Sequence, residues 1–247
     1  GAGLIINPTA TVPKYAHFIF SKTEADKLAF YGRSDFGLGV VLTDESKLDL
    51  FEVNGGQSTV RGVNAIQIED STIGKLLDLD SITSRGSLSI SKSLIEGQTR
   101  IENVRFDSLS VLKDTIIQRD VVITNGRFSG GSISESSFED NIRFDTCKFD
   151  GKLTLYRSAF KKSFEIQMEA NSNFDDERTR TGLLKALHIE QSSFVHGLLI
   201  QGDMAPSLID SLTINCSPSV SGTISVSSAR IDKLQLSGLN PLASISF

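Results

Sequence analysis

Residues 142–160 decide the fold, and they read Ile-Arg-Phe-Asp-Thr-Cys-Lys-Phe-Asp-Gly-Lys-Leu-Thr-Leu-Tyr-Arg-Ser-Ala-Phe. Apolar and polar residues alternate in each half, which predicts short strands with one buried face. Phe149 follows Phe144 by five residues, and Phe160 follows Leu155 by five. Between the halves, Asp150-Gly151 supplies the residue types that tight corners require. The stretch therefore predicts strand, corner, strand, corner.

The same pattern recurs along most of the chain at a pitch of about eleven residues. A second apolar position follows nearly every ladder position by five residues, and the ladder resumes at Leu187-His188-Ile189 and continues to Ile245-Ser246-Phe247. A constant pitch of short strands and corners is typical of a solenoid, in which each coil buries its inward side chains against its neighbours. The ladder positions are Ile68, Leu77, Ile90, Ile101, Leu112, Ile123, Ile133, Phe144, Leu155 and Ile166.

Three short units resemble the repeat of the pentapeptide-repeat proteins, which stack a central Leu or Phe every five residues with a small residue two places before it. The units are Ser136-Ser137-Phe138, Cys147-Lys148-Phe149 and Ser158-Ala159-Phe160. The steps here alternate between five and six, and the Ala-Asp/Asn-Leu signature of that family is missing. The chain is thus similar to a degenerate pentapeptide repeat over residues 66–247. The resemblance implies an all-β, right-handed parallel β-helix of quadrilateral cross-section, and the spacing predicts half-coils of about eleven residues.

Two eleven-residue units would give a coil of about 22 residues, and three units in a triangular coil are the alternative. Either coil leaves unpaired strand edges at its ends, so a terminal cap is expected. Residues 1–65 do not follow the repeat, and Ser21 followed by 23–28 reads as a capped short helix. We therefore expect a small α+β capping or accessory region there, with a separate binding module as the alternative. Its aromatic residues are Tyr15, Phe18, Phe20, Phe30, Tyr31 and Phe36.

The ladder is interrupted once, at about residues 167–186. Acidic residues after Asn173 suit a helix N-terminus, and Thr181 to Leu187 would continue that helix. Insertions in repeat proteins often carry binding, although a helix that simply covers an apolar face fits equally well. Our candidate binding residues in this insertion are Asp176, Glu177, Arg178 and Arg180.

Composition excludes several classes of function. With 25 basic and 30 acidic residues the net charge is -5, which disfavours a nucleic-acid binder. No run approaches the length of a membrane span. Cys147 and Cys216 lie far apart outside any CxxC motif, and we expect both to be buried. His188 and Glu190 would both point outward without a third ligand at fixed spacing, so we predict no metal and no cofactor.

These observations favour a non-enzymatic protein that presents a flat surface to a protein partner. The resemblance implies a bacterial protein of a class that includes gyrase-interacting proteins and secreted effectors. We expect a cytoplasmic protein by default, with a secreted or injected effector as the alternative. A self-assembling scaffold is another reading.

A carbohydrate-binding or polysaccharide-processing β-helix is the main alternative function. Arg143, Tyr156 and Glu165 would form one wall of its groove, although Trp is absent. Ice binding is disfavoured, because it requires a regular Thr-x-Thr ladder and the column of residues at eleven-residue spacing is irregular. That column contains Ser89, Arg100, Val111, Val122 and Ser132.

Overall fold

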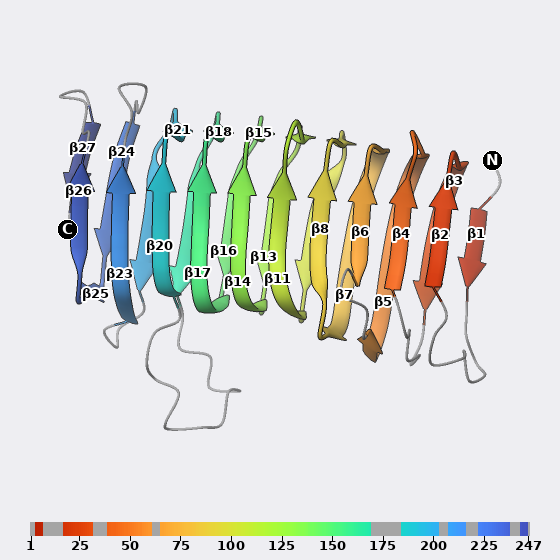
Figure 1. The fold of residues 1–247 in the computed structure, drawn as a ribbon, viewed down its shortest axis with the longest axis horizontal. Helices are drawn as coiled ribbons and strands as arrows, with labels where there is room; N and C mark the ends of the chain where they lie inside the picture. Colours follow the sequence, from red (N-terminus) through yellow and green to blue (C-terminus); the bar gives the residue numbers. More distant parts are fainter. Residues whose placement is uncertain are drawn as a thin grey trace.

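The described residues form one parallel β-solenoid (Figure 1). A computed structural model describes residues 3–6, 17–31, 39–60, 65–168, 184–202, 207–215, 222–237 and 243–246. All elements within these ranges are strands, and all pairings between them are parallel. The prediction of an all-β parallel β-helix is confirmed.

Two long walls of strands run the length of the solenoid. Wall A contains β1 (Gly3–Ile6), β3 (Glu24–Tyr31), β5 (Lys47–Val60), β7 (Thr72–Ser84), β10 (Gln98–Glu102), β13 (Val121–Thr124), β16 (Ile142–Asp145), β19 (Phe164–Met168), β22 (Leu198–Gly202), β24 (Gly222–Ser227) and β27 (Ala243–Ser246). Wall B contains β2 (His17–Ser21), β4 (Gly39–Thr43), β6 (Ile66–Glu69), β8 (Ser87–Ser91), β11 (Arg105–Leu112), β14 (Arg127–Ser134), β17 (Lys148–Tyr156), β20 (Leu184–Glu190), β23 (Ser207–Asn215) and β26 (Leu234–Ser237).

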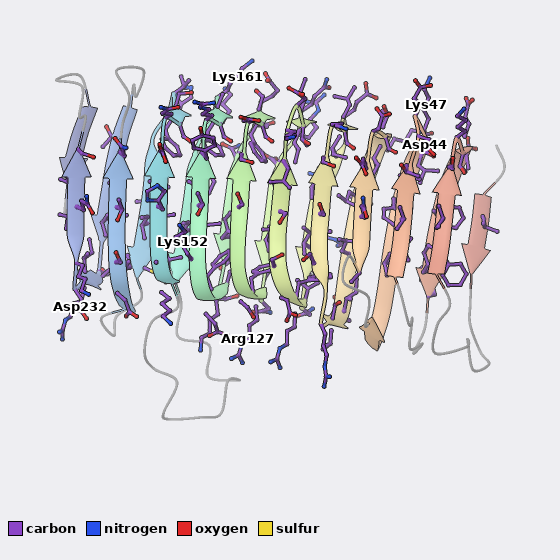
Figure 2. The ribbon with its side chains drawn as sticks, viewed as in Figure 1. Asp44, Lys47, Arg127, Lys152, Lys161 and Asp232 are labelled. Carbon is purple, nitrogen blue, oxygen red and sulfur yellow. The ribbon has the colours of Figure 1, made fainter. Side chains whose placement is uncertain are left out.

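Short strands close the coil at its two narrow edges. One edge contains β9 (Leu94–Ile95), β12 (Ile116–Ile117), β15 (Ser137–Phe138), β18 (Ala159–Phe160) and β21 (Ser193–Phe194). The opposite edge is formed by the last residues of β5 and β7, by the first residues of the long wall B strands from β11 onward, and by β25 (Ala229–Ile231), which pairs with β23. Figure 2 shows charged side chains at both edges, with Lys161 and Lys47 at one edge and Arg127 and Asp232 at the other.

The register fixes the length of a coil. Arg100 is paired with Asp78 in the preceding coil, which lies 22 residues earlier in the chain, and with Val122 in the next coil. A coil therefore contains two eleven-residue units, not three. Residues eleven apart consequently lie on opposite walls, and residues two units apart lie side by side.

The inward positions form a continuous apolar core. Ile101, Ile123, Phe144 and Ile166 of wall A are almost completely buried, as the repeat predicts. The second apolar position of each unit stacks at the edges: the rings of Phe138 and Phe160 are 5.3 Å apart with 19° between their planes. Such burial of parallel-stacked side chains from successive coils is the main stabilising contribution available to this architecture.

A column of buried hydroxyl groups explains the small residue two places before the stacked Phe. The Ser158 hydroxyl donates to the carbonyl of Tyr156 at 3.0 Å. The Ser192 hydroxyl accepts a hydrogen bond from the amide of Ser158 at 3.2 Å, which links adjacent coils. The residue just before each of these serines has a positive φ, for example Arg157 at 47°. The hydroxyl therefore hydrogen-bonds backbone groups that, because of the sharp corner, cannot pair with the neighbouring strand.

The expected helix at Ser21 to Leu28 is wrong. Residues 24–31 form strand β3, which pairs with β1 on one side and β5 on the other. Parallel pairing and the burial of Leu28 and Phe30 override the local helical signal. The described strands before residue 66 thus continue the same two walls in place of the α+β region that we expected.

The interruption is shorter than predicted. Wall A reaches Met168, and Leu184 already belongs to β20, so the helix expected from Thr181 to Leu187 is wrong at its C-terminal end. Ser158 and Ser192 are equivalent residues in the two coils that flank the interruption, and they are 34 residues apart in sequence. The equivalent residues Ser136 and Ser158 of uninterrupted coils are 22 residues apart. Residues 169–183, which include Asp176, Glu177, Arg178 and Arg180, lie outside the described residues.

Candidate functional site

Arg143, Tyr156 and Glu165 do not form one groove wall. Arg143 on β16 and Glu165 on β19 are direct partners on wall A. Tyr156 is the last residue of β17 on wall B. All three side chains point outward, but the solenoid separates the first two from the third. The predicted groove is therefore wrong, and each wall has its own shallow hollow.

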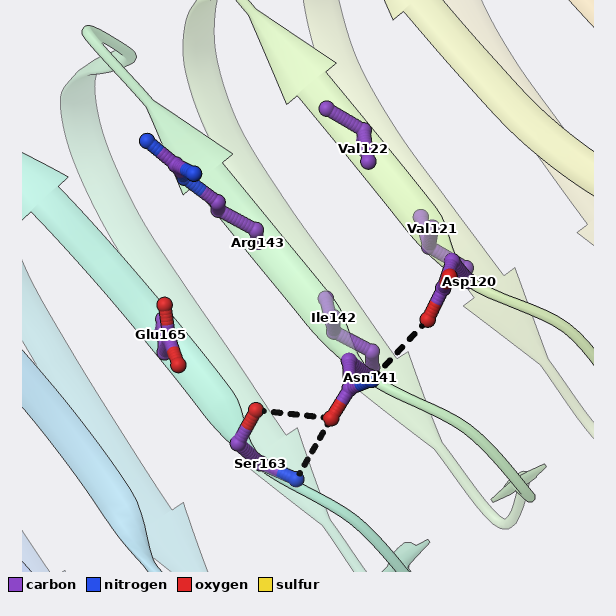
Figure 3. Close-up of a pocket in the computed structure, with 8 residues that line it drawn as sticks. All are labelled: Asp120, Val121, Val122, Asn141, Ile142, Arg143, Ser163 and Glu165. Atoms are coloured by element: carbon purple, nitrogen blue, oxygen red, sulfur yellow. Dashed lines mark hydrogen bonds between the residues drawn. The ribbon is translucent and has the colours of Figure 1, made fainter.

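The hollow on wall A spans β13, β16 and β19 and encloses about 340 Å³. Figure 3 shows a hydrogen-bonded row along one side of it. The Asn141 amide nitrogen donates to Asp120 at 3.0 Å, and the Asn141 amide oxygen accepts from the Ser163 hydroxyl at 2.9 Å. This row ties three successive coils together. The lining residues are Asp120, Val121, Val122, Asn141, Ile142, Arg143, Ser163 and Glu165.

The centre of this hollow combines an apolar side chain with two charges. Val122 is 36% exposed and is the in-register neighbour of Arg143. Arg143 turns toward the adjacent column, where its Nη2 donates to Asp145 at 3.0 Å and to Gln167 at 2.7 Å. In the part of the chain that the structure describes, Glu165 takes part in no hydrogen bond or ion pair.

A paired arginine borders the hollow on its other side. Arg100 is the in-register neighbour of Val122 and makes a two-pronged contact with Asp78, at 3.0 Å from Nε and 2.5 Å from Nη2. The hydrogen bonds to Asp78, together with its charge, raise the pKa of the Arg100 guanidinium. Arg100 is consequently held toward Asp78 and away from Val122, which leaves the apolar side chain accessible.

The hollow on wall B is elongated and encloses about 350 Å³. Its floor follows one outward column through five successive strands: Glu69, Ser91, Leu112, Ser134 and Tyr156. Lys92, Lys113 and Glu135 line it from the adjacent corners. Leu112 was assigned to the inward ladder from the sequence, but Val111 is the buried residue and Leu112 points outward. Because side chains alternate along a strand, an assignment that is shifted by one residue exchanges the inward and outward faces.

The other reactive side chains do not assemble into a site. His188 and Glu190 contact each other at 3.3 Å on the surface of wall B. Among the described residues, no three His, Cys, Asp or Glu side chains lie close enough to hold a metal. Cys147 is buried, and desolvation raises the pKa of its thiol to about 12. Cys216 lies outside the described residues.

Comparisons with protein-family models, with curated proteins and with solved structures gave no match. Within the described ranges no helix is long and apolar enough to cross a membrane.

Sequence reasoning missed most of the residues that line the two hollows. Asp120, Val122, Asn141 and Ser163 belong to neighbouring columns of wall A, and their proximity depends on the two-unit period of the coil. A search for outward residues at steps of two units would have grouped them. A step of one eleven-residue unit, in contrast, alternates between wall A and wall B and so places residues of both walls in one column.

Proposed function

We propose that the protein is a non-enzymatic interaction scaffold that docks a protein partner on wall A, at the hollow around Val122. The observation that supports this most directly is the exposed Val122 between Arg100 and Arg143, with the Glu165 carboxylate beside them. Interface centres combine a buried apolar anchor with arginine and a polar rim. The hollow offers this combination on a single face.

The rigidity of the wall favours such a role. Each lining residue is on or next to a strand paired on both sides, and the Asp120–Asn141–Ser163 row fixes one edge of the hollow. Groups that are already ordered lose little conformational entropy on binding. A flat, preorganised wall therefore gains more from each contact than a loop would.

The charges indicate the chemistry of the partner side chain. Arg143 and Arg100 are already paired with Asp145 and Asp78. Glu165 and the carboxylate of Asp120 remain acceptors, on either side of an apolar floor. A lysine or arginine fits this arrangement, because its methylene stem would pack on Val122 while its cation reached a carboxylate.

Affinity capture from the native host, followed by mass spectrometry, tests the proposal. Capture with the natural chain is compared with capture by Glu165→Lys and by Val122→Asp. The matched control is Glu190→Lys, which places the same charge change on wall B. We expect a protein that is captured by the natural chain and the control but lost with both wall A variants. Equal recovery with all four chains would disprove docking at this hollow.

We also propose, as a second role, self-association through the ends of the described stack. Leu4 on β1 is 48% exposed and Leu234 on β26 is 44% exposed, although both occupy inward columns. Sedimentation velocity over a range of concentrations tests this role. A concentration-dependent dimer that Leu234→Glu abolishes would support it, and a monomer at all concentrations would exclude it.

The relationship to pentapeptide repeats also remains our proposal. It is supported by the buried Ser136 and Ser158, which occupy the small-residue position two places before the stacked Phe138 and Phe160. A chain with one coil replaced by the consensus pentapeptide sequence would fold with unchanged far-UV circular dichroism if the relationship holds. Loss of the cooperative unfolding transition would argue against it.

A further inference from the structure

The hollow on wall B is elongated along the solenoid axis. Its floor crosses five strands, so its length is about 19 Å, or four strand spacings of about 4.8 Å. It runs along the solenoid axis, from Glu69 on β6 to Tyr156 on β17. A linear molecule laid along this groove would meet an equivalent floor position at every strand.

A slot for one ring lies at the Tyr156 end of the groove. Leu112, Ser134 and Tyr156 are consecutive in-register partners. The small Ser134 therefore forms a floor between two larger side chains about 10 Å apart. This recess can take one unit of a chain that runs along the groove beside Tyr156.

The Tyr156 ring is held in place from one side. The Arg157 guanidinium lies 4.9 Å from its ring centroid. Arg157 is itself fixed, because its Nε donates to Gln191 at 2.7 Å and its Nη1 lies 3.8 Å from Glu135. One ring face is thus occupied by a cation, so a ligand that stacks on Tyr156 would use the opposite face. A positioned aromatic ring of this kind is suited to stacking.

Several hydroxyl groups on this wall are not engaged by other described residues. In the described part of the chain, the hydroxyls of Ser91, Ser134 and Tyr156 have no hydrogen-bond partner. The same holds for the neighbouring outward column, which contains Ser89, Ser110, Ser132 and Thr154. Buried corner hydroxyls such as that of Ser158, in contrast, are engaged with the backbone. Wall B therefore presents aligned donors and acceptors to an external molecule.

The charges around the groove are mostly compensated by neighbours. Lys92 lies 3.7 Å from Glu69, and Glu135 is paired with Arg157. Lys113 has no ion-pair partner within the described ranges and can donate to a hydroxyl. The floor itself is uncharged from Ser91 to Tyr156. These features match an uncharged ligand that is rich in hydroxyl groups.

We propose that this groove binds an unbranched, uncharged hexose chain laid along the solenoid axis, with one sugar ring stacked on Tyr156. An extended β-linked hexose chain advances by about one strand spacing per sugar, so successive sugars would meet successive coils. The serine hydroxyls of the wall and Lys113 would hydrogen-bond the sugar hydroxyls. An ice surface fits less well, because Leu112 and Tyr156 protrude from the plane of the wall. This inference concerns wall B and does not depend on protein docking at wall A.

The test is a glycan array of neutral β-linked hexose chains, followed by calorimetry with the best chain in lengths from one to eight sugars. The affinity should rise with length up to about five sugars, one for each strand of the groove, and then level off. Tyr156→Ala should weaken binding about tenfold through loss of stacking. Ser134→Tyr should abolish binding of the longer chains, because it fills the slot.

Two controls separate the groove from the rest of the chain. Tyr156→Phe keeps the ring and should retain most of the affinity, while Arg230→Ala removes an exposed side chain from β25, outside both hollows, and should leave hexose binding unchanged. Unfolding temperatures establish that each variant is folded. Absence of binding to every hexose chain on the array would overturn the proposal. Binding that is unaffected by both Tyr156→Ala and Ser134→Tyr would overturn it equally.

Discussion

The rings of Phe160 and Phe194 stack with their centroids 4.9 Å apart and their planes inclined by only 9°, although the two residues lie on opposite sides of the interruption in the sequence. Phe138 and Phe160, which stack in the same column, belong to coils that follow each other without an interruption. Successive coils therefore close in the same way with and without the interruption. About twelve residues of the longer connection, between Phe160 and Phe194, are not part of the repeating unit.

Removal of twelve residues from within 170–182 should leave the solenoid folded. The flanking strands β19 and β20 keep their partners, and a shorter connection changes the free energy of unfolding by less than about 1 kcal/mol. Urea denaturation followed by circular dichroism measures this. The deletion must stop before Leu184, which is buried and paired with Phe149. A control deletion extended through Leu184 should destabilise the fold, and equal stability of the two deletions would contradict the register.

Thr99→Val should stabilise the protein by about 1 kcal/mol. Thr99 is 2% exposed and sits between Leu77 and Val121 in the core of wall A. Its hydroxyl is buried without a hydrogen-bond partner in the part of the chain described. Valine has nearly the same shape and no polar group to desolvate. Thermal or urea unfolding measures the difference.

Thr115→Val is the matched control for that prediction. Thr115 is equally buried, but its hydroxyl donates to the carbonyl of Leu112 at 2.7 Å. The same substitution should therefore destabilise the protein by about 1 kcal/mol. Destabilisation at both positions would show that the hydroxyl at Thr99 has a hydrogen-bond partner.

Cys147 should resist thiol reagents as long as the protein is folded. Burial raises the pKa of its thiol to about 12, and the sulfur contacts the carbonyl of Ile123 at 3.2 Å. The thiolate is the reactive form, so labelling should follow the rate of unfolding. A Cys216→Ser variant reports on Cys147 alone, with labelling in guanidinium chloride as the reference. Rapid labelling in native buffer would contradict the buried position.

Asp150 should contribute to the stability of the protein at neutral pH. Partial burial raises the pKa of this carboxyl, but hydrogen bonds from Arg127 and Lys148 outweigh burial and lower it. A lowered pKa in the folded state stabilises the fold above the unfolded value of about 3.9. That contribution is lost as the pH falls through the folded-state pKa. Asp150→Asn should therefore be less stable than the natural chain at pH 7, with a difference that shrinks below about pH 4.

Replacement of both donors tests the cause of this pH dependence. With Arg127→Gln and Lys148→Gln combined, only burial acts on Asp150, so its pKa should rise and the pH dependence should reverse in sign. Urea unfolding of the double variant at pH 7 and pH 4, each with and without Asp150→Asn, measures this. An unchanged pH profile in the double variant would exclude the two donors as the cause.

The side chains that point into the core could be predicted from the sequence, because the spacing of apolar residues is a local signal. Ile101, Ile123, Phe144, Leu155 and Ile166 are all buried, as the ladder predicts. The prediction failed where two apolar residues are adjacent, as at Val111 and Leu112, since alternation cannot then assign the faces. It failed also at β3, where pairing with β1 and β5 outweighs the helical signal of residues 21–28.

The outward half could not be predicted, because side chains in the two hollows are neighbours only through the length of the coil. Ser89, Arg100, Val111, Val122 and Ser132 were compared as one column, yet Ser89 and Ser132 lie on wall B, Arg100 and Val122 on wall A, and Val111 in the core. With a coil of two units the wall B column becomes Ser89, Ser110, Ser132 and Thr154, which is regular.

The sequence by itself determined that this chain is a parallel solenoid and which residues fill its interior, because burial in each coil follows from alternation and constant pitch. Only the tertiary structure decided that a coil takes two units, and thus that Arg143 and Glu165 lie side by side on wall A while Tyr156 lies on wall B. The physical reason is that strand register between coils is set by many hydrogen bonds and by core packing acting together. No short segment of the sequence contains that information.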